Sequence, residues 1–178
     1  MVEWLLDRGA VPAFLGGLPV STALHTALRR GHLHIATTLL KAMESAAVID
    51  SYGCTPLHIL CMETQYQNTT EAAVNFALEL VQKSCPLDAL DHEGITALHH
   101  CVINDSPELT EMLLLHGAKP DALIPDTWVS PLTIAAIEKN MRIAELLMRY
   151  GADPYVKTRE GQCPATIYKE IERQARLQ

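Results

Sequence analysis

Thr96-Ala97-Leu98-His99 is one of five related tetrads that decide the fold of this chain. Their first residues follow one another at intervals of 33, 41, 34 and 33 positions. A unit that recurs about every 33 residues predicts a stacked repeat protein, in which neighbouring units bury one another's apolar faces. The other four tetrads are Thr22-Ala23-Leu24-His25, Thr55-Pro56-Leu57-His58, Ser130-Pro131-Leu132-Thr133 and Cys163-Pro164-Ala165-Thr166.

Each tetrad is expected to open a helix. The hydroxyl of Thr96 can accept a hydrogen bond from an unpaired backbone N–H at a helix start. In three other copies proline comes second, and proline is favoured at the first helical position. A second helix is predicted from about Pro107 to His116, and Gly117 is suited to the left-handed conformation that ends a helix.

These parts together resemble the ankyrin repeat, in which G-x-T-P-L-H opens an inner helix, G-H-x-x-x-A-x-x-L-L forms an outer helix and G-A-D-P precedes a turn. The stretches 31–40 and 151–154 carry the second and third parts. The resemblance implies an all-α solenoid of stacked helix-turn-helix units with β-hairpin-like turns. It also implies that the tetrad histidines make local hydrogen bonds at the start of each inner helix.

The repeat boundaries predict a single domain over residues 1–178. We expect a partial repeat or cap over 1–15, full repeats over 16–49, 50–90, 91–123 and 124–157, and a capping partial repeat over 158–178. The chain opens on an outer-helix pattern with no inner helix before it. That start fits either a capping element or a cut within a longer array.

Two intervals depart from the regular period. The 41-residue interval holds eight extra residues near 63–70, a polar stretch that predicts a loop, with a helix restarting at Thr70. The insertion is either a tolerated surface loop or part of a binding face. In the 34-residue interval the turn glycine is absent and Trp128 lies near the tip of the turn. Trp128 either contacts a partner or folds back on the neighbouring turn.

Composition and charge exclude several classes of function. The formal net charge is −7, and Arg29-Arg30 is the only adjacent basic pair, so a nucleic acid is not expected as a partner. No apolar run approaches about 18 residues, which predicts no membrane span. The N-terminus lacks a basic start followed by a long apolar stretch, so a secretory signal is not predicted. We expect a cytoplasmic or nuclear protein.

The histidines and cysteines do not predict a metal site or an enzyme. In His99-His100-Cys101, adjacent helical side chains point about 100° apart, so they cannot converge on one ion. The five scattered cysteines are interpreted as reduced, buried small side chains. Catalytic and nucleotide-binding motifs are absent from the sequence. We therefore expect no catalysis, no metal, no cofactor and no small-molecule substrate.

The resemblance implies that partners bind to the fingertips of the turns and the solvent-facing side of the inner helices, here called the concave face. The positions that match carry apolar side chains able to form a groove, basic charge in the first repeat and acidic charge further along. Ordinary solvated surface is the alternative. The candidate residues are Arg29, Arg30, Tyr52, Met62, Glu63, His92, Glu93, Ile95, Ile103, Asn104, Asp126, Trp128, Ile137 and Glu138.

The resemblance therefore predicts a non-catalytic protein–protein interaction module. Such a module would bind a peptide segment or a folded partner, as part of an adaptor, scaffold or regulatory protein. The alternative is an array that targets or recruits substrates for an enzyme or channel domain outside this chain.

Overall fold

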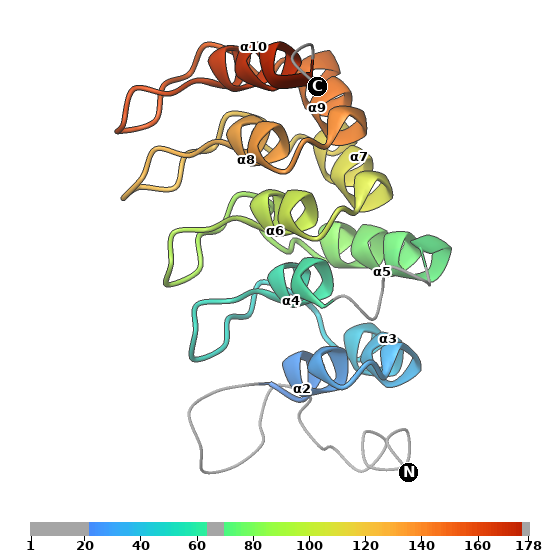
Figure 1. Ribbon diagram of the computed structural model, residues 1–178. Helices are drawn as coiled ribbons and strands as arrows, with labels where there is room; N and C mark the ends of the chain where they lie inside the picture. Colours follow the sequence, from blue (N-terminus) through green and yellow to red (C-terminus); the bar gives the residue numbers. More distant parts are fainter. Residues whose placement is uncertain (1–21, 64–69, 176–178) are drawn as a thin grey trace.

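The computed structural model of the protein describes residues 22–63 and 70–175, and this part of the chain contains α-helices and no strand. The predicted partial repeat over 1–15 lies outside the described residues. Figure 1 shows the helices stacked in two columns, with turns projecting from one side. The inner helices are α2 (Ala23–Arg29), α4 (Pro56–Met62), α6 (Ala97–Ile103), α8 (Pro131–Ile137) and α10 (Pro164–Ala175). The outer helices are α3 (Leu33–Lys41), α5 (Thr70–Gln82), α7 (Pro107–Leu115) and α9 (Met141–Arg149).

The tetrads open the inner helices as predicted. Thr96 is the N-cap of α6, and its hydroxyl accepts from the backbone N–H of His99. The ring Nδ1 of His99 lies 2.8 Å from the Thr96 hydroxyl and accepts from the Thr96 N–H, which completes a capping box. The same arrangement joins Thr22 to His25 and Thr55 to His58.

The tetrad histidines also tie each repeat to the next, a role that the pattern alone did not reveal. Because Nδ1 accepts, Nε2 carries the proton and donates to a carbonyl of the following turn. These bonds run from His25 to Cys54 at 3.0 Å, from His58 to Ile95 at 3.1 Å, and from His99 to Val129 at 3.3 Å. The three histidine side chains are fully buried, so each bond is shielded from water.

The core is a continuous layer between the two columns of helices. The tetrad leucines are fully buried, and each such side chain contributes about 1.5–3 kcal/mol relative to an exposed one. The five cysteines are free and buried, as predicted. Burial raises the pKa of the Cys54 and Cys85 thiols to about 11, so both stay protonated and unreactive near neutral pH.

The turns that precede α4, α6, α8 and α10 are called fingers here, around residues 50–54, 91–95, 124–129 and 158–162. A backbone hydrogen bond closes each finger, such as Asp91 N–H to Ile95 C=O at 3.0 Å. Gly94 has φ +76°, and a Cβ on it would lie 2.5 Å from the Cδ of Pro125 in the next finger. The fingers are therefore packed against one another along the stack.

The insertion in the 41-residue interval lengthens an outer helix. The helix restarts at Thr70 as predicted, but α5 has 13 residues where α3, α7 and α9 have nine. The first turn of α5 therefore extends beyond the length of the other outer helices, and it projects past its neighbours in Figure 1. Residues 64–69 lie outside the described part of the chain.

Candidate protein-binding face

Three apolar side chains occupy equivalent positions at the ends of successive inner helices. Met62, Ile103 and Ile137 are the last residues of α4, α6 and α8. Ile103 is 48% exposed and Ile137 is 54% exposed, while Met62 is half-buried. Packed helices lie about 8–10 Å apart, so these side chains form an apolar stripe along the stack.

Two aromatic residues extend this surface onto the fingers. Tyr52 is 64% exposed at the tip of one finger, and Trp128 is 49% exposed at the tip of another. The guanidinium of Arg29 lies over the ring of Tyr52, with Cζ 5.5 Å from its centroid.

Arg29 holds a finger in place as well as contributing charge. Its guanidinium donates to Oδ2 of Asp50 at 2.6 Å, and the Asp50 side chain is only 1% exposed. Burial pushes the pKa of Asp50 upward, but the Arg29 hydrogen bond and the N–H groups of Tyr52 and Cys54 outweigh it, so the pKa is lowered. Arg30, the other half of the basic pair, is exposed.

Asn104 also has intramolecular partners. Its side-chain amide donates to the carbonyl of Cys61 at 2.9 Å and to that of Met62 at 3.1 Å. These carbonyls belong to the last turn of α4, where the helix leaves carbonyl groups unpaired. Asn104 therefore links two neighbouring repeats.

The other predicted residues differ in exposure. Ile95 is half-buried in its finger, between the exposed Glu93 and the buried Thr96. Glu63 is half-buried after the end of α4. The exposed members are His92, Glu93, Asp126 and Glu138.

Trp128 stands at the place where other fingers have glycine. Gly53, Gly94 and Gly161 each lie two residues before a tetrad and have positive φ. Trp128 has φ +59°, which is a rare conformation for a bulky side chain. The finger closes with Ile124 N–H to Val129 C=O at 3.0 Å, so the extra residue is accommodated inside the turn.

Asp91 holds a further finger together through three hydrogen bonds. Its Oδ1 accepts from the N–H groups of Glu93 and Ile95, both at 2.9 Å. Its Oδ2 lies 3.0 Å from Nε2 of His100, and both side chains are nearly buried. The sequence pattern did not single out Asp50 or His100, because Arg29 and Asp91 reach them only in the folded chain.

Within residues 22–63 and 70–175, no group of three or more His, Cys, Asp or Glu residues could hold a metal ion. In the same part of the chain, no helix is both long enough and apolar enough to cross a membrane.

Comparison with known proteins gives the family. A family model described as ankyrin repeats, in three copies, matches residues 1–72 and 66–158. The chain is 34% identical over 147 residues to the nuclear factor NF-kappa-B p105 subunit of Mus musculus, covering 79% of this chain and 14% of that protein. It is 31% identical over 139 residues to the B-cell lymphoma 3 protein homolog of Mus musculus, covering 73% of this chain and 30% of that protein.

A third relative is named a putative palmitoyltransferase, ZDHHC13 of Danio rerio. The identity is 27% over 172 residues, covering 96% of this chain and 25% of that protein. The chain therefore spans less than a third of the length of each of these relatives. The matched family model, the stacked helices and the capping boxes agree: the chain belongs to the ankyrin-repeat family.

Proposed function

We propose that this domain is a non-catalytic protein-interaction module, part of an adaptor, scaffold or regulatory protein. It binds a peptide segment or a folded partner on its concave face and fingertips. The observation that carries this proposal is the apolar stripe of Met62, Ile103 and Ile137, flanked by the exposed rings of Tyr52 and Trp128.

Ile103 and Ile137 each leave about half of their surface in water, so core packing alone does not account for apolar side chains there. Contiguous exposed apolar surface commonly marks an interaction site. Aromatic side chains are also enriched among the residues that carry most of the binding energy in interfaces. The stripe and the two rings together fit a partner that inserts apolar or aromatic side chains.

The distribution of exposed charge on the domain would orient a bound partner along the stack. Arg30 is exposed near the first repeat, while Glu93, Asp126 and Glu138 are exposed further along. A partner with acidic residues near α2 and basic residues toward α8 would be oriented by this polarity. Arg29 is committed to Asp50, so the basic contribution comes chiefly from Arg30.

The proposed contact residues follow from this placement. Arg29 and Asn104 act indirectly, by fixing a finger and a helix end. The direct contacts would come from Arg30, Tyr52, Met62, Glu63, His92, Glu93, Ile95, Ile103, Asp126, Trp128, Ile137 and Glu138. The partner is a protein, in a cytoplasmic or nuclear setting, with no part for nucleic acid or a small-molecule substrate.

Site-specific photo-crosslinking tests this placement. A photoreactive amino acid is introduced at Tyr52 or Ile137 on the concave face, or at Met141 or Met148, which are exposed on the outer helix α9. In cells, the concave positions should cross-link to the same partner proteins, and the outer positions should not. Capture of those proteins only from the α9 positions would contradict the proposal.

A second candidate function is an array that recruits substrates or directs an attached enzyme or channel domain. It is favoured by the zebrafish relative, which is named a palmitoyltransferase and of which this chain matches only 25%. Sequencing the complete open reading frame tests it. An adjoining enzyme or channel domain in frame would support this role, and an initiator at Met1 with a stop codon after Gln178 would contradict it.

A further inference from the structure

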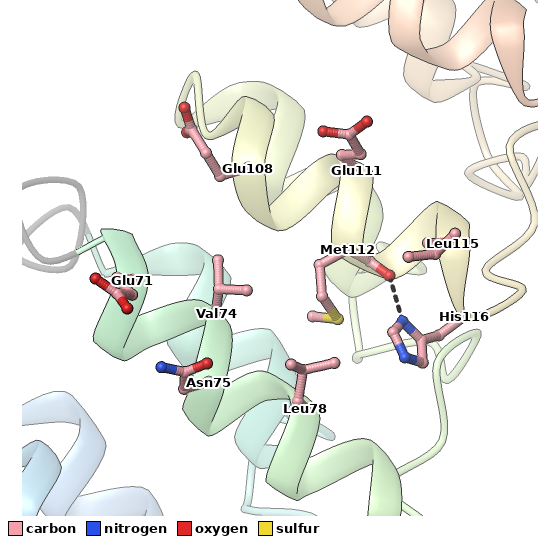
Figure 2. Close-up of a pocket in the computed structure, with 9 residues that line it drawn as sticks. All are labelled: Glu71, Val74, Asn75, Leu78, Glu108, Glu111, Met112, Leu115 and His116. Atoms are coloured by element: carbon pink, nitrogen blue, oxygen red, sulfur yellow. Dashed lines mark hydrogen bonds between the residues drawn. The ribbon is translucent and has the colours of Figure 1, made fainter.

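An apolar groove lies on the opposite side of the stack, between the outer helices α5 and α7 (Figure 2). Its volume is about 560 Å³. It is remote from the fingers, which project from the other edge of the molecule in Figure 1. Neither the repeat pattern nor the proposed concave-face function accounts for it.

Side chains from two repeats form the floor of the groove. Val74 and Leu78 of α5 point toward Met112 of α7 in Figure 2. Val74 and Leu78 are half-buried and Met112 is buried, while Leu115 at the end of α7 is 67% exposed. This floor leaves apolar surface open between two helices whose other exposed positions are largely polar.

The rim of the groove is acidic. Glu71, Glu108 and Glu111 line it, and no lysine or arginine is among its lining residues. Glu108 pairs with Arg142 of α9 at 3.0 Å, but both side chains are well exposed, and such surface pairs are weak. An apolar side chain entering the groove would therefore be flanked by negative charge.

The inserted turn of α5 helps to build this groove. Glu71 belongs to the four residues by which α5 exceeds α3, α7 and α9. Ala73 and Phe76 are buried and fix the lengthened helix to the core, so its outward side chains are held in place. The interval that breaks the sequence period thus supplies one acidic side of the rim.

We propose that this groove binds a short amphipathic helical segment of another protein, with apolar side chains on one face and lysine or arginine on its flanks. The apolar face would lie on Val74, Leu78, Met112 and Leu115, and the basic flanks would meet Glu71, Glu108 and Glu111. The nine residues of α7 span about 13 Å at 1.5 Å per residue, which matches roughly two helical turns of ligand. A second copy of this chain is a poorer occupant, because its net charge is −7.

A designed peptide tests the proposal. The probe is a fluorescein-labelled 14-residue helix with leucines at i, i+3, i+4 and i+7 and lysines on both flanks. Two controls are a scrambled peptide of the same composition and a peptide with glutamate in place of lysine. Fluorescence anisotropy should show the probe binding the wild-type chain at least tenfold more tightly than either control, and less tightly as salt is raised.

Variants then locate the site. Glu71→Lys with Glu111→Lys should weaken probe binding at least tenfold and should favour the glutamate peptide. Glu145→Lys with Glu160→Lys makes the same change in net charge at exposed residues outside the groove and should alter binding less than twofold. Leu115→Lys, at a mostly exposed position, should also abolish binding without lowering the thermal midpoint.

Other outcomes separate this proposal from its alternatives. Equal loss of binding in the two double-lysine variants, or equal binding of the scrambled peptide, would show attraction by overall charge alone and would overturn it. Concentration-dependent dimerisation that Leu115→Lys abolishes would assign the groove to a second copy and overturn it as well. Tyr52→Ala with Trp128→Ala should leave probe binding unchanged, so failure here is distinguishable from failure of the concave-face function.

Discussion

The guanidinium of Arg159 lies over the indole ring of Trp128, with Cζ 5.6 Å from the ring centroid. The Arg159 N–H donates to the carbonyl of Thr127 at 3.0 Å, and its side chain donates to that of Pro125 at 3.2 Å. Between the earlier fingers, a residue of the next finger packs against a turn glycine instead. At this one junction a cation–π contact takes that place, so Trp128 both joins two fingers and stays half exposed.

Replacing Trp128 by glycine should change the stability of the domain little, because two opposing effects nearly cancel. Glycine relieves the left-handed strain, worth about 1–2 kcal/mol, but loses the cation–π contact, worth about 0.5–1 kcal/mol at an exposed site. The free energy of unfolding from urea titration should therefore stay within about 1 kcal/mol of wild type. Arg159→Ala should lower it slightly, because the strain remains. A large loss of stability in Trp128→Gly would show that the ring is chiefly structural.

Two glycine-to-alanine changes should differ in cost. Gly94 and Gly117 both have positive φ, but only at Gly94 would the new Cβ meet a neighbour, the ring of Pro125 at 2.5 Å. Gly117→Ala should cost about 1 kcal/mol of unfolding free energy from backbone strain alone. Gly94→Ala should cost about 2–4 kcal/mol, because overpacking adds to that strain. Equal costs measured by urea unfolding would contradict the packing of the fingers.

The Asp50 side chain should matter more for its hydrogen bonds than for its charge. Asp50→Asn keeps an oxygen that can accept from the N–H groups of Tyr52 and Cys54, and it should cost about 1 kcal/mol. Asp50→Ala removes the oxygen that accepts from both N–H groups and the oxygen that pairs with Arg29, and it should cost about 3 kcal/mol. Asp126→Ala, at an exposed fingertip, is the control and should change stability by less than about 0.5 kcal/mol.

The buried tetrad histidines should make the domain less stable in acid. Burial lowers the pKa values of His25 and His58, and lowers that of His99 to about 4. Below pH 6.5 the unfolded histidines take up protons that the folded ones do not, so stability falls as the pH falls from about 6.5 toward 4. The carboxylate pKa values of Asp50 and Asp91 lie below 3.8, so their stabilisation persists through this range.

Urea unfolding at pH 7.5, 6.5, 5.5 and 4.5 measures this effect. Each fully buried histidine should remove up to about 1.4 kcal/mol of unfolding free energy per pH unit within the window. The control is His34→Gln, at an exposed position, which should leave the slope unchanged. A free energy that is flat between pH 6.5 and 4.5 would show that these rings are not kept neutral by burial.

The sequence predicted the helical stack because its signals are local and repeated. The Thr96–His99 capping box and the buried tetrad leucines depend on residues three or four positions apart, and the 33-residue period shows which units are equivalent. The local hydrogen bonds of the tetrad histidines were implied by the family resemblance, whereas their bonds to the next repeat were not.

Such local signals could not predict which residues far apart in the sequence contact each other. Arg29 meets Asp50 across 21 positions, and Asn104 meets Cys61 across 43, so neither pair shows in a local pattern. The start of α5 was a local signal by contrast: the sequence predicted that the helix restarts at Thr70, and α5 begins there.

One affinity measurement tests whether the concave face binds the partner. A partner protein captured by cross-linking is titrated against the wild-type chain and against Tyr52→Ala with Trp128→Ala, with the thermal midpoint recorded for both. We predict at least a tenfold loss of affinity, since two exposed aromatic anchors are removed, and a thermal midpoint close to that of wild type. Unchanged affinity in the folded double variant would contradict it.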